Sequence, residues 1–214
     1  MCRGPAAVRV DEQVHVEQEQ QQQLGIVSMM KDGSVSAAVR SCFKRIGIHN
    51  PTIYCYNNPA LYPLIAYGPE THWFFTGNTP DFVTDAGAPG FDPRILDITT
   101  KMMFFVCYSH QYVCALSGSQ IEQLPTADIG FYPLIITDHP LFAGVDPSSL
   151  FFAYYTQYIR TENLPHGWDL LARRFDHIAV MQKGPTMFSC QVHPERIDTT
   201  YRVLQNWLSM RPRG

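Results

Sequence analysis

Short apolar runs alternate along this chain with segments whose apolar residues recur at helical spacing. Residues 24–30 form a β-type run, and after the turn at residues 32–34 the apolar positions of 35–46 fit one face of a helix. The further expected strands are residues 52–56, 72–76, 102–107, 129–136, 151–155, 177–181 and 187–192, and residues 203–208 form an amphipathic closing helix. This alternation predicts an α/β fold with a mostly parallel central sheet.

The two ends of the chain differ from the part between them. Residues 1–23 are polar and glutamine-rich, with too few apolar side chains to offset the entropy of ordering, so we expect a disordered tail there. Residues 24–209 are expected to form one domain, and residues 210–214 a short basic tail. A chain of 214 residues is long enough to bury a core of that kind.

Composition narrows the classes of function. With 45% hydrophobic and 16% charged residues the chain is typical of a folded globule, and its net charge of −3 offers no basic field for nucleic acid. The six cysteines show no CxxC pair and the histidines no metal spacing, so we expect neither a metal site nor a cofactor. Without a signal-peptide core or an apolar run of roughly 20 residues, we expect no membrane association and a reducing, cytoplasmic setting.

Cys107 ends the apolar run 102–106 and opens a helix-like segment. A nucleophile displayed on a strand-to-helix turn has this pattern, and the carboxyl ends of parallel strands are where reactive groups collect. Far downstream, His193 and Glu195 follow another apolar run and supply an imidazole and a carboxylate. The alternative for Cys107 is a buried core cysteine, which is common in apolar runs, and His110 fits a packing role better than that of a base.

Four stretches, in order, carry a family resemblance. Residues 105–111 match the pattern Gly-x-Cys-x-Gly-His-Gln at Cys, His and Gln, and residues 191–195 match Gln-Phe-His-Pro-Glu at all but the second position. Between them, residues 128–134 and 138–144 resemble Glu-Ile-Gly and Pro-Leu-Phe-x-Gly stretches. The chain thus resembles the class I glutamine amidotransferases, the triad-type glutaminases, over roughly residues 24–208. The resemblance implies a three-layer, flavodoxin-like sandwich.

Catalytic roles follow from the resemblance. It implies that Cys107 is the nucleophile, His193 its base and later the acid for the leaving ammonia, and Glu195 the group that orients the imidazole. It also implies an oxyanion hole made by the backbone N–H groups of Tyr108 and Asn78.

Substrate contacts are implied at four further positions. Gly77 lies beside the oxyanion turn, and Gln111 lies one helical turn after the nucleophile, where it either lines the pocket or caps local backbone groups. Thr156 and Gln157 align with a Ser-His pair that helps to hold glutamine in several members.

The chain departs from the family at the turn around the nucleophile. Phe105 and Ser109 stand where the family has glycine, because the turn is tight and its backbones pack closely. We expect the phenylalanine either to need extra room beside the turn or to shift it.

These residues predict a cysteine hydrolase that acts on a γ-glutamyl amide, most simply glutamine, giving glutamate and ammonia through a γ-glutamyl thioester. The resemblance further implies either a separate synthase partner that accepts the ammonia or a stand-alone hydrolase. Two alternatives stay open. One is a pseudo-amidotransferase that serves as a binding or regulatory module, and the other is a γ-glutamyl peptidase.

Overall fold

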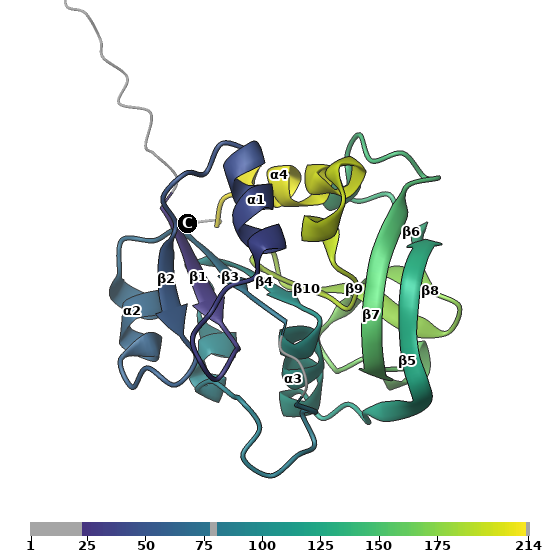
Figure 1. Cartoon of the computed structure of the whole chain (residues 1–214), viewed down its shortest axis with the longest axis horizontal. Coiled ribbons are helices and arrows are strands. Elements are labelled where there is room, and N and C mark those ends of the chain that lie inside the picture. The colour runs from purple at the N-terminus through teal and green to yellow at the C-terminus, as the bar shows by residue number, and fades with distance from the viewer. Residues whose placement is uncertain (1–22, 78–80, 213–214) are drawn as a thin grey trace, which may run out of the picture.

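The computed structural model describes residues 23–77 and 81–212 of the chain. Their centre is an eight-stranded sheet with the order β2-β1-β3-β4-β10-β9-β8-β6 (Figure 1). The strands, in chain order, are β1 (Leu24–Ser28), β2 (Thr52–Cys55), β3 (His72–Phe75), β4 (Met102–Val106), β6 (Ile135–Ile136), β8 (Asp169–Arg174), β9 (His177–Lys183) and β10 (Met187–Cys190). The first five in spatial order pair in parallel, and β9, β8 and β6 extend the sheet antiparallel.

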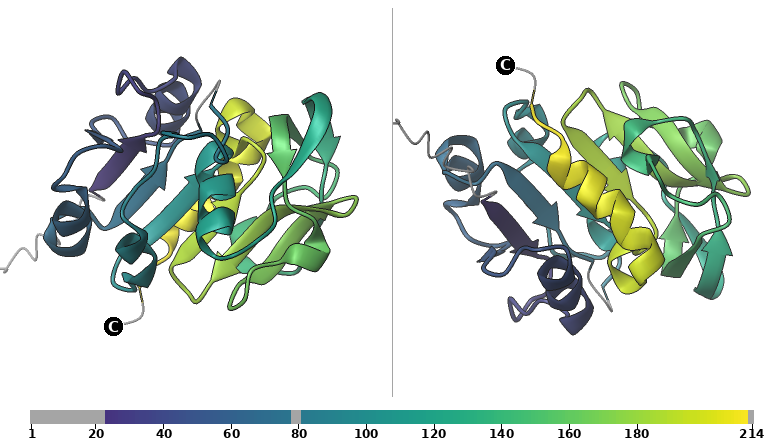
Figure 2. Two further views of the ribbon diagram at one scale, coloured as in Figure 1. Left: turned by 90° about the horizontal axis from the view of Figure 1, so that it is seen from below. Right: turned by 90° about the horizontal axis from the view of Figure 1, so that it is seen from above.

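Helices cover both faces of this sheet, as Figure 2 shows in two views. They are α1 (Ala37–Arg45), α2 (Leu61–Tyr67), α3 (Tyr108–Leu116) and α4 (Tyr201–Ser209), with short 3-10 turns such as η1 (Pro93–Asp97) and η4 (Pro194–Arg196). The three-layer α/β architecture with a mostly parallel sheet is therefore confirmed. None of the helices in residues 23–77 and 81–212 is long and apolar enough to span a membrane.

Alternation along β4 divides the core in two. Met102, Phe104 and Val106 face the apolar cluster that includes α1 and α4, while Met103 and Phe105 face the cluster that includes α2, η1 and α3. All five side chains are fully buried, and each large apolar side chain removed from water contributes roughly 1.5–3 kcal/mol. β4 is thus a central strand buried on both faces, which is why its sequence is apolar throughout.

The expectation of one strand over residues 129–136 is wrong. Most of that segment belongs to β5 (Glu122–Pro133), which pairs with β7 (Leu150–Tyr158) in a separate two-stranded antiparallel sheet, and only β6 joins the main sheet. The strand expected at residues 151–155 is confirmed as part of β7. The tail expected over residues 1–23 lies, except for Gln23, outside the described residues.

Candidate active site

Cys107 occupies the sharp turn between β4 and α3. Its backbone has φ 54° and ψ −108°, and Phe175 is the one other non-glycine residue with positive φ in the described ranges 23–77 and 81–212. Such a conformation costs a side-chain-bearing residue on the order of 1–3 kcal/mol, and it persists where the surroundings enforce it. The turn displays the sulfur at the carboxyl end of a central strand, which is the geometry of a nucleophile elbow.

Hydrogen bonds on both sides hold the elbow in place. The Cys107 N–H donates to the carbonyl oxygen of Cys190 at 2.8 Å, which ties the turn to β10. The Gln111 N–H donates to the carbonyl oxygen of Cys107 at 3.0 Å, which starts the helical pattern of α3. The strained residue is therefore fixed between a strand and a helix.

Ser109 takes the place of a family glycine by bonding to the strand ends. Its buried Oγ accepts the Val106 N–H at 2.7 Å and lies 2.9 Å from the carbonyl oxygens of both Val106 and Phe75. The hydroxyl thus links β4, β3 and the first turn of α3. The close approach that glycine would allow is replaced here by direct polar contacts.

The Phe105 side chain packs on the face of the sheet opposite to α1. Its ring centroid lies 4.6 Å from that of Phe75 and 5.7 Å from that of Phe91, within the cluster that includes α2, η1 and α3. Cys107, in contrast, belongs to the cluster on the α1 and α4 face. Of the two expected outcomes, the extra room is the one observed, and an aromatic cluster supplies it.

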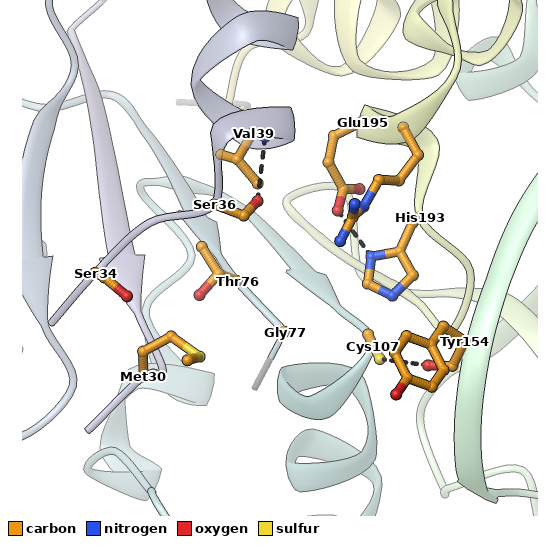
Figure 3. Close-up of a pocket in the computed structure, with 11 residues that line it drawn as sticks. Met30, Ser34, Ser36, Val39, Thr76, Gly77, Cys107, Tyr154, His193 and Glu195 are labelled. Carbon is orange, nitrogen blue, oxygen red and sulfur yellow. Dashed lines mark hydrogen bonds and ion pairs between the residues drawn. The ribbon is translucent and has the colours of Figure 1, made fainter. Parts of the chain in front are cut away.

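His193 and Glu195 lie at the start of η4, after β10. The His193 Nδ1 is 2.8 Å from Glu195 Oε1, and both side chains are buried (Figure 3). Because a carboxylate only accepts, Nδ1 carries the hydrogen and the Nε2 side of the ring is left for the thiol. The backbone N–H of His193 donates to the Phe152 carbonyl oxygen at 2.8 Å, which ties the backbone of His193 to β7.

Charge raises the pKa of His193. Burial on its own lowers this pKa, but the carboxylate of Glu195 and the thiol group of Cys107 raise it by more, so the net shift is upward from 6.5. The imidazole therefore tends to hold its proton beside the sulfur. A protonated imidazole in this place can act as the acid for a leaving group.

Gly77 lies immediately beside the sulfur and the imidazole. A Cβ added there would lie 3.2 Å from Cys107 Cβ, 3.7 Å from Cys107 Sγ and 3.4 Å from His193 Cε1. The gap between thiol and imidazole therefore fits a residue without a side chain. The thiol itself donates to the carbonyl oxygen of Tyr154, with Sγ at 3.6 Å.

Of the two expected oxyanion donors, Tyr108 belongs to the described residues. Tyr108 is the first residue of α3, so its N–H is among those that no carbonyl of the helix can accept, and it lies next to the nucleophile. Asn78 lies outside the described residues.

The expected substrate residues Gln111 and Gln157 bond to protein groups. Gln111 Nε2 donates to the Gln157 carbonyl oxygen at 2.7 Å and to Gln191 Oε1 at 3.3 Å, and Gln157 Oε1 accepts the Val83 N–H at 3.0 Å. They tie α3, β7 and the segment after residue 80 together around the elbow. Thr156 lies half-buried on β7. These three are not among the described residues that line the cavity beside Cys107, whereas Gly77 is.

His110, three residues after the nucleophile, is a packing residue. It is fully buried, its Nδ1 lies 2.7 Å from Ser189 Oγ, and burial lowers its pKa to about 3. It is therefore neutral and unsuited to act as a base at neutral pH.

A cavity of about 220 Å³ opens beside Cys107 and His193. Its lining is drawn in Figure 3 and comprises Met30, Ser34, Ser36, Val39, Thr76, Gly77, Cys107, Tyr154, His193, Glu195 and Arg196. Sequence reasoning missed the contribution from residues 30–39. The signal was available, because this segment follows the carboxyl end of β1 and so meets the same edge of the sheet as Cys107.

Comparison with known proteins gives the following relatives. The family model described as "Glutamine amidotransferase class-I" matches residues 33–209. A GMP synthase [glutamine-hydrolyzing] of Solidesulfovibrio magneticus is 30% identical over 135 residues, covering 60% of this chain and 26% of that protein. One of Caldicellulosiruptor saccharolyticus is 27% identical over 166 residues, covering 73% of this chain and 31% of that protein. The chain thus matches about a quarter to a third of the length of these curated relatives.

Solved structures show the same fold. A Thermoplasma acidophilum protein provisionally assigned as part of a GMP synthase superposes with a TM-score of 0.70 at 14% identity, covering 87% of this chain and 92% of its own.

Proposed function

The chain belongs to the class I glutamine amidotransferase family, and from that membership and its geometry we propose that it hydrolyses γ-glutamyl amides, most simply glutamine, through a thioester on Cys107. The domain that does so is proposed to span residues 24–209. The observation that carries this proposal is the conjunction at one sheet edge of a cysteine on a strained elbow and a buried His193–Glu195 pair.

In the first half-reaction, the Cys107 thiolate attacks the γ-carbonyl carbon and forms a C–S bond. His193, protonated and oriented by Glu195, gives its proton to the amide nitrogen as the C–N bond breaks, so ammonia leaves. In the second half-reaction, water loses a proton to His193, attacks the thioester carbonyl and displaces the Cys107 thiolate. Glutamate is the second product.

The oxyanion formed in both half-reactions needs donors already in place. We assign this role to the Tyr108 N–H at the start of α3, together with Asn78. Gly77 is assigned to the substrate pocket because it borders both reacting side chains. Gln111, Thr156 and Gln157 are proposed to contribute by shaping the β7 and α3 side of the site.

The fate of ammonia is a further part of the proposal. The matched relatives are named as glutamine-hydrolysing GMP synthases and are several times longer than the matched stretch. We therefore propose a synthase partner as the ammonia acceptor.

The test is covalent labelling together with product analysis. Incubation with a glutamine-derived chloroketone should add one label to Cys107, located by peptide mass measurement, and glutamine should yield ammonia and glutamate in equal amounts. Cys107→Ser and His193→Ala should each abolish ammonia release, whereas Cys55→Ser, at a half-buried cysteine on β2, should not. Neither label nor ammonia in the wild-type protein would mean that the chain is a pseudo-amidotransferase.

A further inference from the structure

β5 is an edge strand that is open on one side. It pairs with β7 in the two-stranded sheet, and in Figure 1 it lies on the side of β7 away from β4 and β10. β7 has a bridge on its other edge, from Phe152 to His193, whereas within residues 23–77 and 81–212 no pairing beyond β7 involves β5. One row of β5 backbone N–H and C=O groups is therefore open to a further strand.

The regular part of this edge, residues 128–133, carries no free charge. Its pairing with β7 is irregular between Gln123 and Asp128 and regular from there to Pro133. This stretch contains no lysine or arginine, and its one carboxylate, that of Asp128, forms an ion pair with Arg174 of β8. Charged side chains, above all lysine, are what usually keeps an open edge from pairing with another chain.

The outward face of the same strand is apolar. Ile129 and Phe131 are 57% and 58% exposed, and the Phe131 ring centroid lies 5.3 Å from that of Phe152 on β7. Outward positions of an antiparallel sheet with one solvated face are normally polar. Apolar side chains exposed along an open edge therefore mark a surface that gains from association.

The sequence of the strand is complementary to itself. Directly opposed residues of an antiparallel pair share one face, so a two-fold axis between two copies must pass through a residue. An axis at Gly130 opposes Ile129 to Phe131 of the second copy, and Phe131 to its Ile129. It also opposes Asp128 to Tyr132 of the second copy, so no charge meets a like charge.

Neighbouring registers lose this match. With the axis at Ile129, Phe131 would oppose Ala127, and with the axis at Phe131, Ile129 would oppose Pro133. Gly130 also suits the axis because it places no side chain between the two strands.

We propose that β5 pairs with β5 of a second copy of this chain, antiparallel about a two-fold axis at Gly130, and so forms a homodimer. A second copy is the occupant because every opposed pair of residues then matches without any change of sequence. The inference is independent of the proposed function, since it uses no catalytic group.

Pairing would turn a two-stranded sheet into a four-stranded one. Two strands alone are marginally stable, and three or more with an apolar face are needed for independent stability. β7 supplies the carbonyl oxygens of Phe152 and Tyr154, which accept the His193 N–H and the Cys107 thiol. The dimer would therefore stabilise the strand that contacts both of these residues.

Sedimentation equilibrium measures the association. Interfaces that bury less than about 1,200 Å² are weak, and one pair of strands lies at this low end, so the measurement extends to about 100 μM protein. We expect the mass of two chains there and of one chain on dilution. Ile129→Lys should keep the chain monomeric, with the unfolding midpoint showing that it folds. Phe175→Lys, at a 69% exposed aromatic residue in the turn after β8, is the matched control and should still dimerise.

Disulfide cross-linking tests the register. In the double variant Ile129→Cys/Phe131→Cys each new thiol opposes one of the second copy, with Cβ atoms roughly 4.5–5.5 Å apart, so mild oxidation should join two chains on a non-reducing gel. In either single variant the two new thiols are diagonal neighbours about 7–8 Å apart, and cross-linking should be about fivefold lower or less. The wild-type chain, with its own cysteines, gives the baseline.

The outcomes decide the proposal. A dimer that is lost in Ile129→Lys, kept in Phe175→Lys and cross-linked in the double variant supports it. A monomer at every concentration overturns it. A dimer that persists in Ile129→Lys, or single variants that cross-link as well as the double variant, would mean that another surface or a face-to-face contact joins the copies, and would also overturn it.

Discussion

Ser109 Oγ lies 2.9 Å from the Phe75 carbonyl oxygen, so the first turn of α3 is bonded to the end of the neighbouring strand β3. The same oxygen accepts the Val106 N–H. A polar side chain therefore fastens the elbow at a position where the family has glycine.

Removal of this hydroxyl should destabilise the protein. In Ser109→Ala the buried Val106 N–H loses its acceptor, and an unsatisfied buried group costs about 1–3 kcal/mol. Urea unfolding at fixed pH should show that loss in the free energy of unfolding. Ser148→Ala, in an exposed turn, is the control and should change it by no more than about 0.5 kcal/mol. Equal stability of the two variants would contradict the assigned role.

Phe105 should stabilise the protein as a core residue rather than strain the elbow at Cys107. Phe105→Ala removes a fully buried ring from the cluster with Phe75 and Phe91, and truncation of a buried phenylalanine costs about 3–5 kcal/mol. Denaturant unfolding measures this loss, with Phe131→Ala, exposed on β5, as the control. A gain in stability in Phe105→Ala would show instead that the phenylalanine strains the elbow.

A side chain at position 77 should separate the thiol from the imidazole. The added Cβ of Gly77→Ala would come within 3.2 Å of Cys107 Cβ and 3.4 Å of His193 Cε1, closer than ordinary contacts. The neighbours must give way by a few tenths of an ångström. Because a displacement of about 1 Å in an active site lowers rates by about 10²-fold, kcat/KM for glutamine should fall by a smaller factor, roughly threefold to tenfold. Steady-state kinetics checks this, with the unfolding midpoint measured in parallel. Full activity in Gly77→Ala would contradict the tight geometry.

Glu195 should contribute a pH-dependent part of the stability. The pKa of His193 is raised in the folded state, so the stabilisation from its charge is fully present below pH about 6.5 and is lost as the pH rises through the raised value. Glu195→Gln removes the largest cause of that rise. The free-energy difference between wild type and variant should therefore be larger at about pH 6 than at about pH 9. Urea unfolding at both pH values measures it, and a difference that grows with pH would be inconsistent with the pair.

Local pattern was enough to predict the elements that place the nucleophile. The apolar run of β4 followed by a helical segment predicts a turn at Cys107, and the structure has β4 end at Val106 and α3 begin at Tyr108. The mostly parallel character of the sheet also follows from the alternation of strands and helices. Boundaries of β1, β3 and β10 differ from the expectation by one or two residues.

Contacts between segments that are distant in sequence could not be predicted from the sequence pattern. The contact of the Cys107 thiol with the Tyr154 carbonyl depends on where β7 lies, and β7 was expected without its pairing to β5. The room for Phe105 depends on Phe75 and Phe91, which come from two other segments. The entry of residues 30–39 into the cavity depends on the strand order, which places β1 two positions from β4.

The positive φ of Cys107 lowers the stability of the fold, while its thiol is the group that the proposed reaction needs. Glycine adopts this conformation without strain, so the backbone alone would favour glycine there. Serine or alanine at this position would inherit the strain without providing a thiol. A population of variants screened only for folding would therefore drift toward glycine at position 107, and only selection for the sulfur would hold the cysteine in place.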